Sequence, residues 1–168
     1  AYGTTTSSNA RLTVVTAAVV GWGANNPGQI SPPPESLNPT ALASGDNYGL
    51  VLRNDATVFG WGFGGYGETV PPAGLTNVTA IAAKGAISLA LKSDGTMAAW
   101  GNNFYGATNV PPRLASVSGI SAGGAHALAL RDDGTVVAWG RDYEGQSEVP
   151  SRLTDVVQVA AGGYHSLA

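Results

Sequence analysis

The sequence predicts an all-β fold, a β-propeller built from about four blades of 39 residues with four strands each. The first observation is the dipeptide Trp-Gly, which recurs at Trp22, Trp61, Trp100 and Trp139, with 39 residues from each copy to the next. The second is that other residues keep the same step, among them Asp55, Asp94 and Asp133. A repeat of about 40 residues made of short alternating apolar stretches is typical of propeller blades.

The repeats are expected to cover residues 13–168, and residues 1–12 are expected to form a polar arm outside them. Blade spans of about 39–77, 78–116 and 117–155 follow from the period, with a split blade made of 156–168 and 13–38. Residues 13–168 span four periods, so that the two ends of the chain fall in phase. We therefore expect an incomplete ring or a ring closed by head-to-tail pairing, within the chain or with a second copy as a homodimer. A piece of a longer repeat array is the other interpretation.

Residues 78–116 show the internal plan of a blade most clearly. Strands are expected at 78–83, 88–92 and 96–100, where apolar residues alternate with small or polar ones at the two-residue period of a sheet. Ser93-Asp94-Gly95 predicts a tight hairpin between the second and third strands, because Gly accepts a positive φ. A short outer fourth strand is expected at 108–110, and it should end at Pro111-Pro112, because Pro has no N–H to donate.

The loops at one end of the blades are rich in aromatic residues. In an antiparallel meander, the first-to-second and third-to-fourth connections leave from the same end of the sheet. Seven of the nine Phe and Tyr residues fall in these connections: Tyr48, Phe63, Tyr66, Phe104, Tyr105, Tyr143 and Tyr164. Exposed Tyr clusters are enriched in protein interfaces. We therefore expect these seven residues, together with Arg141 beside Tyr143, to bind a partner.

Composition excludes several classes of function. The net charge is −3 with only 8 Lys and Arg, which argues against a nucleic-acid surface. There is no Cys for a disulfide or a thiolate site, and no apolar run is long enough for membrane insertion. No cofactor is expected. Low charge with many Gly and Thr residues favours a secreted protein or one on a bacterial cell surface.

The polar residues that repeat are explained better by structure than by chemistry. His126 and His165 lie one period apart, so they fall on different blades and are expected to pack as hydrogen-bonded core residues rather than to form a metal or catalytic site. The repeated Asp residues are expected to cap their own turns rather than to bind calcium. The repeated Trp is expected to fill the space between blades. No nucleophile, base and orienting acid occur together, so we do not expect an enzyme.

Two segments carry a resemblance to a known family. They run from Ala122-Gly123-Gly124-Ala125-His126 through Asp133-Gly134-Thr135 to Trp139-Gly140, and over Ala161-Gly162-Gly163-Tyr164-His165-Ser166-Leu167. Both resemble the repeat of the regulator of chromosome condensation family, in its bacterial branch, which includes the beta-lactamase inhibitory protein II propeller. The first repeat departs most, with Tyr48 in place of the His and Ala56 in place of the turn Gly. The resemblance implies a propeller, usually of seven blades, whose members act mainly by binding proteins on one face.

The function expected from these observations is a non-enzymatic protein-binding module that is inhibitor-like or acts in adhesion or as a scaffold. The alternative is a carbohydrate-binding surface module with one aromatic platform in each blade. The loops vary strongly between repeats, as 25–27 and 141–143 show. This variation favours one composite site for a protein partner over regularly spaced sugar pockets.

Overall fold

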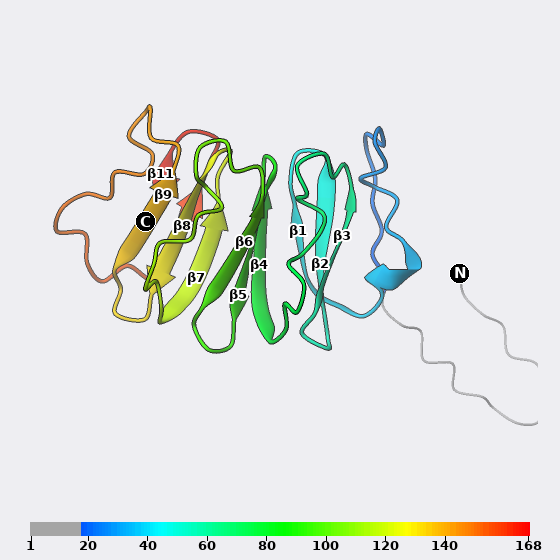
Figure 1. Cartoon of the computed structure of the whole chain (residues 1–168), viewed down its shortest axis with the longest axis horizontal. Helices are drawn as coiled ribbons and strands as arrows, with labels where there is room; N and C mark the ends of the chain where they lie inside the picture. Colours follow the sequence, from blue (N-terminus) through cyan, green and yellow to red (C-terminus); the bar gives the residue numbers. More distant parts are fainter. Residues whose placement is uncertain (1–17) are drawn as a thin grey trace, which may run out of the picture.

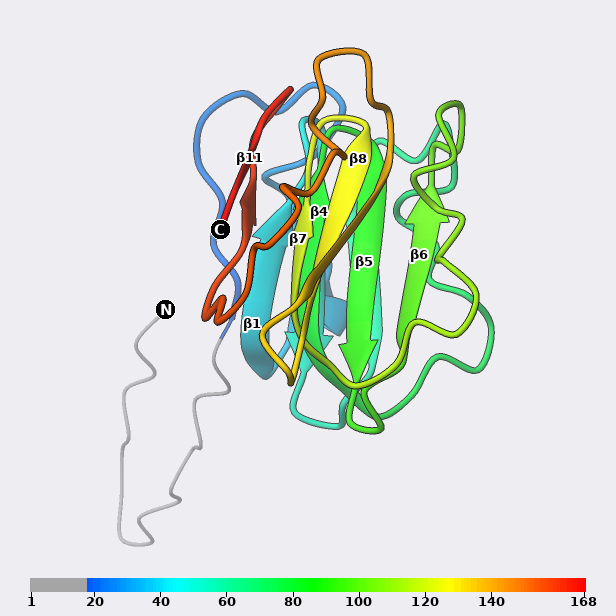
Figure 2. The ribbon, with the colours of Figure 1, turned by 90° about the vertical axis from the view of Figure 1, so that its left-hand side faces the viewer.

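The computed structural model describes residues 18–168 as a row of small antiparallel sheets that stand side by side (Figure 1). Three of the sheets have three strands, and a fourth sheet has two. Figure 2 looks along this row and shows the sheets one behind another. The described residues contain one 3-10 turn, Pro34–Ser36, and no helix that is long and apolar enough to cross a membrane. The all-β prediction is therefore confirmed.

Each three-stranded sheet is a meander in which consecutive strands pair. The first contains β1 (Pro39–Ser44), β2 (Tyr48–Arg53) and β3 (Val58–Gly62); the second contains β4 (Val78–Lys84), β5 (Ile87–Lys92) and β6 (Met97–Gly101); the third contains β7 (Val117–Ala122), β8 (His126–Arg131) and β9 (Val136–Gly140). The two-stranded sheet contains β10 (Ala160–Ala161) and β11 (Ser166–Leu167). The strands predicted at 78–83, 88–92 and 96–100 thus agree with the structure to within about one residue at each end.

The predicted fourth strand of each blade is wrong. At 108–110 the backbone forms turns: the Asn109 N–H donates to the Gly106 carbonyl at 3.0 Å, and the Val110 N–H donates to the Thr108 carbonyl at 3.1 Å. Gly106 has a φ of 76°, which bends the chain away from an extended path. Amides that donate within turns are not available to a neighbouring strand. Val110 nevertheless packs against the hydrophobic core, so the segment covers its sheet without pairing with it.

The core lies in the seams between neighbouring sheets, and the middle strand of each sheet contributes most to it. Leu50 on β2 and Leu89 on β5 are completely buried, because each middle strand packs against a neighbouring sheet. One buried cluster joins Tyr48, Leu50 and Leu52 of the first sheet to Val78, Ala90 and Trp100 of the second. Burying such aliphatic and aromatic side chains contributes about 1.5–3 kcal/mol each. The seams therefore hold the row together.

A Trp side chain fastens each three-stranded sheet to the segment that precedes it in the chain. Trp61 Nε1 donates to the Gln29 carbonyl at 2.9 Å, Trp100 Nε1 to the Glu68 carbonyl at 2.8 Å, and Trp139 Nε1 to the Ala107 carbonyl at 2.8 Å. In every case the acceptor lies 32 residues earlier, before the first strand of the sheet that carries the Trp. Trp100 and Trp139 are buried, whereas Trp22 is 85% exposed. The expected core role of the repeated Trp is thus confirmed for these two residues and is wrong for Trp22.

The two halves of the expected split blade lie at opposite ends of the row (Figure 1). Residues 18–33 contain no strand, and β10 and β11 lie at the far end of the row. The described chain therefore does not close a ring on itself. The polar arm predicted for residues 1–12, and the repeat match at 13–17, lie outside the described residues.

Candidate functional site

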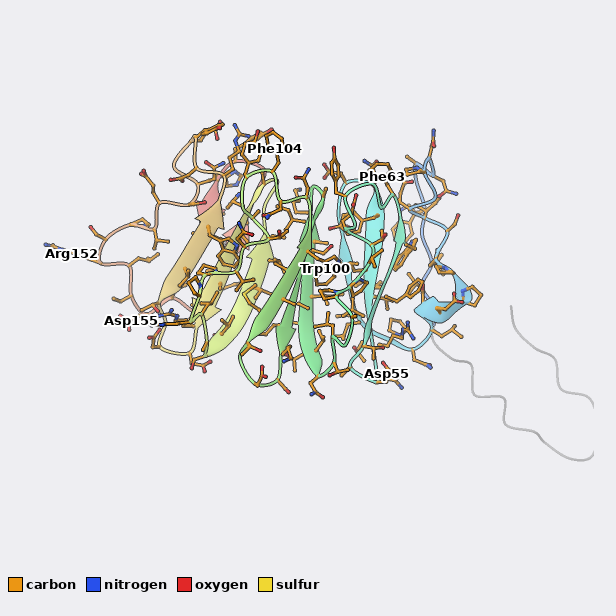
Figure 3. All side chains as sticks on the ribbon, viewed as in Figure 1. Asp55, Phe63, Trp100, Phe104, Arg152 and Asp155 are labelled. Carbon is orange, nitrogen blue, oxygen red and sulfur yellow. The ribbon has the colours of Figure 1, made fainter. Side chains whose placement is uncertain are left out.

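The loops with aromatic residues and the loops with aspartates lie at opposite ends of the sheets. Figure 3 shows Phe63 and Phe104 at one end and Asp55 and Asp155 at the other. Chain direction produces this separation, because every hairpin between the second and third strands of a sheet turns at the same end. We call the end with Phe63 and Phe104 the loop face.

Five predicted site residues form one group on the loop face, which we call the aromatic–arginine cluster: Phe104, Tyr105, Arg141, Tyr143 and Tyr164. The Phe104 and Tyr105 rings meet edge to face with their centroids 5.3 Å apart, and the Tyr105 and Tyr143 rings do so at 5.9 Å. The Arg141 Cζ atom lies 5.7 Å from the Tyr105 ring centroid, 5.1 Å from that of Tyr143 and 4.7 Å from that of Tyr164. The cluster therefore unites the loops of three successive repeats around one guanidinium.

Arg141 is held in place from several sides. Its backbone N–H donates to the Ala125 carbonyl at 2.9 Å, and its carbonyl accepts the Ser147 hydroxyl at 2.9 Å. The guanidinium Nη2 donates to Glu144 Oε1 at 2.8 Å. Because the Glu144 carboxylate is half exposed, this ion pair contributes at most about 1 kcal/mol. A guanidinium over aromatic faces adds roughly 0.5–2 kcal/mol for each well-placed ring.

The loop that carries Tyr143 is ordered by its own polar side chains. The Ser147 N–H donates to Asp142 Oδ1 at 2.7 Å, and the Glu144 N–H donates to Gln146 Oε1 at 3.0 Å. These bonds close the loop over residues 142–147. Tyr143 is consequently presented from a fixed backbone.

The cluster combines this order with exposure. Phe104 is 85% exposed, Tyr143 76% and Tyr164 60%. Tyr105, which contacts the Phe104 and Tyr143 rings, is 40% exposed. An exposed aromatic patch on a rigid frame loses little conformational entropy when a partner covers it. Such a patch is suited to binding.

Phe63 and Tyr66 form a separate pair on the loop after β3. Their ring centroids are 6.4 Å apart, and both side chains are exposed. No aromatic contact among the described residues joins this pair to the aromatic–arginine cluster. The predicted site residues thus divide into two groups on one face.

Tyr48 does not belong to the exposed surface, and its prediction as a partner-binding residue is wrong. It is only 2% exposed, and its hydroxyl donates to the Ile87 carbonyl at 2.6 Å and lies 2.8 Å from Ser88 Oγ. Burial raises the pKa of this hydroxyl above its ordinary value. Tyr48 opens β2 and lies 39 residues before Ile87 and 78 before His126, which open β5 and β8. The repeat register therefore contained the signal that Tyr48 is a seam residue.

The histidine position is structural too. His126 is fully buried, and its Nε2 atom lies 3.0 Å from Ser166 Oγ across the seam. Burial, reinforced by the nearby His165, lowers the pKa of His126, so the neutral ring is favoured. Within residues 18–168, no group of three or more His, Cys, Asp or Glu side chains is arranged to hold a metal ion.

The repeated aspartates cap their turns at the end opposite the loop face. Asp94 Oδ1 accepts the Thr96 hydroxyl at 2.5 Å and the Thr96 N–H at 3.0 Å, and Asp55 and Asp133 do the same for Thr57 and Thr135. The bonds from Thr96 lower the pKa of Asp94 to about 2. These residues fix hairpin turns and take no part in the aromatic–arginine cluster.

Successive antiparallel meanders at a 39-residue step define the chain as a protein of the β-propeller class, and in each three-stranded sheet a Trp bonds to the segment that precedes the sheet. Comparison with known families gives the repeat a name. Residues 78–107 and 117–146 match the regulator of chromosome condensation (RCC1) repeat. The resemblance to this repeat is therefore confirmed for these two segments. Its assignment to the bacterial branch stays a prediction.

Several solved structures have a similar fold. The chain superposes on Prp20p from Saccharomyces cerevisiae with a TM-score of 0.66 at 17% identity, covering 77% of this chain and 43% of that one. It superposes on the ectodomain of the receptor kinase CR4 from Physcomitrella patens with a TM-score of 0.61 at 24% identity, covering 74% and 35%. For human WBSCR16 the TM-score is 0.59 at 23% identity, covering 76% and 43%.

At these identities the likeness shows the fold alone, and the chain spans less than half the length of each of these proteins. No curated protein matches the sequence.

Proposed function

We propose that this chain is a non-enzymatic protein-binding module that engages its partner through the aromatic–arginine cluster on the loop face. The observation that carries the proposal is the joint exposure of Phe104 and Tyr143 on a frame fixed by Arg141. Tyr, Trp and Arg dominate the small set of residues that supply most of the energy in protein interfaces. An inhibitor-like, adhesion or scaffold role would use such a surface directly.

The shape of the surface supports one composite site. Tyr105, Tyr143 and Tyr164 come from the loops of three different repeats and meet around one Arg. A sugar-binding surface with one platform in each blade would keep its rings apart. The second pair, Phe63 and Tyr66, extends the same face toward the first sheet and gives a partner a second point of contact.

The structural neighbours support protein binding as the class of function. The structure of Prp20p was described together with its binding properties to Gsp1p and histones. A shared fold does not transfer a partner from one protein to another. The partner of this chain is therefore defined here by chemistry: a protein surface with an apolar patch for Phe104 and Tyr143 and polar groups for the Arg141–Glu144 rim.

The test compares two matched variants of the whole chain. Affinity capture on the immobilised wild-type chain identifies a partner, and its Kd is then measured by calorimetry. The double variant Phe104→Ser, Tyr143→Ser is expected to weaken binding by more than about tenfold, because two exposed aromatic contacts are lost. Val70→Ser removes an exposed apolar side chain outside the cluster and serves as the control.

Two results would contradict the proposal. One is a partner that binds the double variant and the control variant equally well. The other is strong binding on a glycan array that is lost when Tyr105 and Tyr143 are replaced by Ala, which would assign the aromatic face to carbohydrate.

A further inference from the structure

One buried position in the loops after the third strands differs between the repeats. Glu68, Ala107 and Gln146 lie 39 residues apart, each directly after a turn Gly with a positive φ. All three residues are buried, but the side chain of Ala107 ends at its Cβ atom. The second repeat therefore lacks a long polar side chain where the first and third repeats bury one.

Each of the two long side chains accepts a hydrogen bond within its own loop. Glu68 Oε2 accepts the Tyr66 N–H at 2.8 Å, and Gln146 Oε1 accepts the Glu144 N–H at 3.0 Å. Both donors lie two residues before the acceptor, and Tyr105 takes that place in the second repeat. Among the described residues the Tyr105 N–H donates to no acceptor. The second repeat thus has the donor of this bond without its acceptor.

The backbone of Ala107 is placed in the same way as that of Glu68. The Glu68 carbonyl accepts Trp100 Nε1 and the Ala107 carbonyl accepts Trp139 Nε1, both at 2.8 Å. A Cβ added to the Gly after Trp100 would lie 3.1 Å from the Glu68 Cβ, and one added to the Gly after Trp139 would lie 3.1 Å from the Ala107 Cβ. A longer side chain at position 107 would therefore start from the same point as that of Glu68.

A pocket of about 120 Å³ lies at Ala107. Tyr105 and Asn102 line it from the same loop, and Ala86 and Ala125 line it from the connections before β5 and β8. The space that Glu and Gln side chains fill in the neighbouring repeats is thus open in the second repeat. We call it the Ala107 pocket.

Asn102 supplies a second donor at this pocket. Its Oδ1 atom accepts the Phe104 N–H at 2.8 Å, which fixes the orientation of the amide. Its Nδ2 group donates to no acceptor among the described residues. The backbone of Asn102 is also fixed, because its N–H donates to the Ala86 carbonyl at 2.9 Å. Two N–H donors at the Ala107 pocket thus lack acceptors.

The cations beside the pocket favour a negatively charged occupant. The Arg141 N–H donates to the carbonyl of Ala125, which lines the pocket. The guanidinium pairs with Glu144 through Nη2, but its Nε atom is buried and has no partner among the described residues. Lys84, two residues before Ala86, forms no ion pair in the same part of the chain. N–H donors bind a carboxylate more strongly than an uncharged amide oxygen.

We propose that the Ala107 pocket binds a glutamate side chain of the protein partner. Its carboxylate accepts the Tyr105 N–H, as Glu68 Oε2 accepts the Tyr66 N–H in the first repeat, and it also accepts a bond from Asn102 Nδ2. The identity of this occupant rests on the proposed function, because Tyr105 belongs to the aromatic–arginine cluster. The missing acceptor is a property of the pocket itself.

The first experiment tests the pocket without the partner. The backbone amide resonances of the whole chain are followed by NMR while N-acetyl-glutamate N-methylamide is added. The Tyr105 amide is expected to shift and to saturate, whereas the Tyr66 amide already donates to Glu68 and is the internal control. The corresponding blocked glutamine is expected to bind about fivefold more weakly, because it brings no charge to Arg141.

Two matched variants fill the pocket from within. Ala107→Gln restores the acceptor, so it is expected to abolish the shift and to slow the hydrogen exchange of the Tyr105 amide. Ala107→Met has a similar length but only a weak acceptor, so it is expected to abolish the shift and to leave this exchange fast. The Trp139 indole N–H donates to the carbonyl at position 107 and should stay protected in both variants, which shows that the fold is kept.

A partner captured on the immobilised chain separates this inference from the proposed function. Ala107→Gln and the double variant Phe104→Ser, Tyr143→Ser are each expected to weaken partner binding more than about tenfold. If only the double variant weakens binding, the proposed function stands and the glutamate pocket is refuted. The pocket is also refuted if the Tyr105 amide does not respond to blocked glutamate, responds equally to blocked glutamine, or responds equally in Ala107→Gln.

Discussion

Trp100 shows at the scale of one residue how this molecule holds together. Its ring is buried against the first sheet, and its Nε1 atom donates to the backbone carbonyl of Glu68 at 2.8 Å. A buried indole stabilises through its apolar area, and its N–H also satisfies an acceptor that water cannot reach. Trp22, by contrast, is 85% exposed, and it donates to no carbonyl among the described residues. The role of the repeated Trp thus depends on whether a preceding repeat supplies an acceptor and a surface to pack on.

Trp100→Phe is expected to lower the free energy of unfolding by about 1–3 kcal/mol, because it removes buried area and the bond to Glu68. Trp22→Phe is expected to change the free energy of unfolding by less than about 0.5 kcal/mol, as is usual for an exposed side chain. Urea unfolding followed by circular dichroism measures both. Equal effects of the two substitutions would contradict the seam role.

At the scale of the element, the hairpin turn between the second and third strands shows one departure from the repeat. Gly95 and Gly134 occupy this turn with φ values of 74° and 75°, and Ala56 occupies it with a φ of 61°. The left-handed region costs a residue with a Cβ roughly 1 kcal/mol more than it costs Gly. The first hairpin therefore carries backbone strain that the other two avoid.

Ala56→Gly is expected to stabilise the chain by roughly 0.5–1 kcal/mol, since relief of the strained φ is partly offset by the larger backbone entropy of Gly in the unfolded chain. Gly95→Ala is the matched reverse change. It is expected to destabilise, because its Cβ would also lie 3.2 Å from the Ser116 backbone. Melting temperatures of the two variants should shift in opposite directions. A lower melting temperature for Ala56→Gly would refute the strain.

Strand positions and turns could be predicted from the sequence, because three repeats in register show the same alternation and the same Asp turn. The outer strand at 108–110 could not, since its β-branched residues fit a strand while the amides of Asn109 and Val110 donate within turns. Tyr48 is predicted in the loop between the first and second strands, but it opens β2 and is buried, as His126 opens β8 and is buried. The 39-residue register of Tyr48 with His126 predicts this burial, whereas its position beside a turn does not.

The sequence predicts which loops form the site but not which of their side chains meet. The sequence identifies the loops that carry Phe104, Tyr105 and Tyr143, because turn residues surround them. It does not show that Arg141 gathers rings from three repeats, since that depends on the distance between neighbouring sheets. For the same reason it does not separate Phe63 and Tyr66 from the cluster.

At the scale of the whole molecule, the row of sheets carries an ordered aromatic surface on its loop face. Trp61, Trp100 and Trp139 each donate to the carbonyl 32 residues earlier. These bonds, together with the buried clusters between the sheets, hold successive repeats in fixed positions.

Hydrogen exchange of the four Trp indole N–H groups, followed by NMR, measures these bonds most directly. The indole N–H groups of Trp61, Trp100 and Trp139 should exchange slowly, because each donates to a carbonyl. The Trp22 indole, which is 85% exposed, should exchange rapidly. Four indoles that exchange at similar rates would show that these bonds do not hold the sheets together.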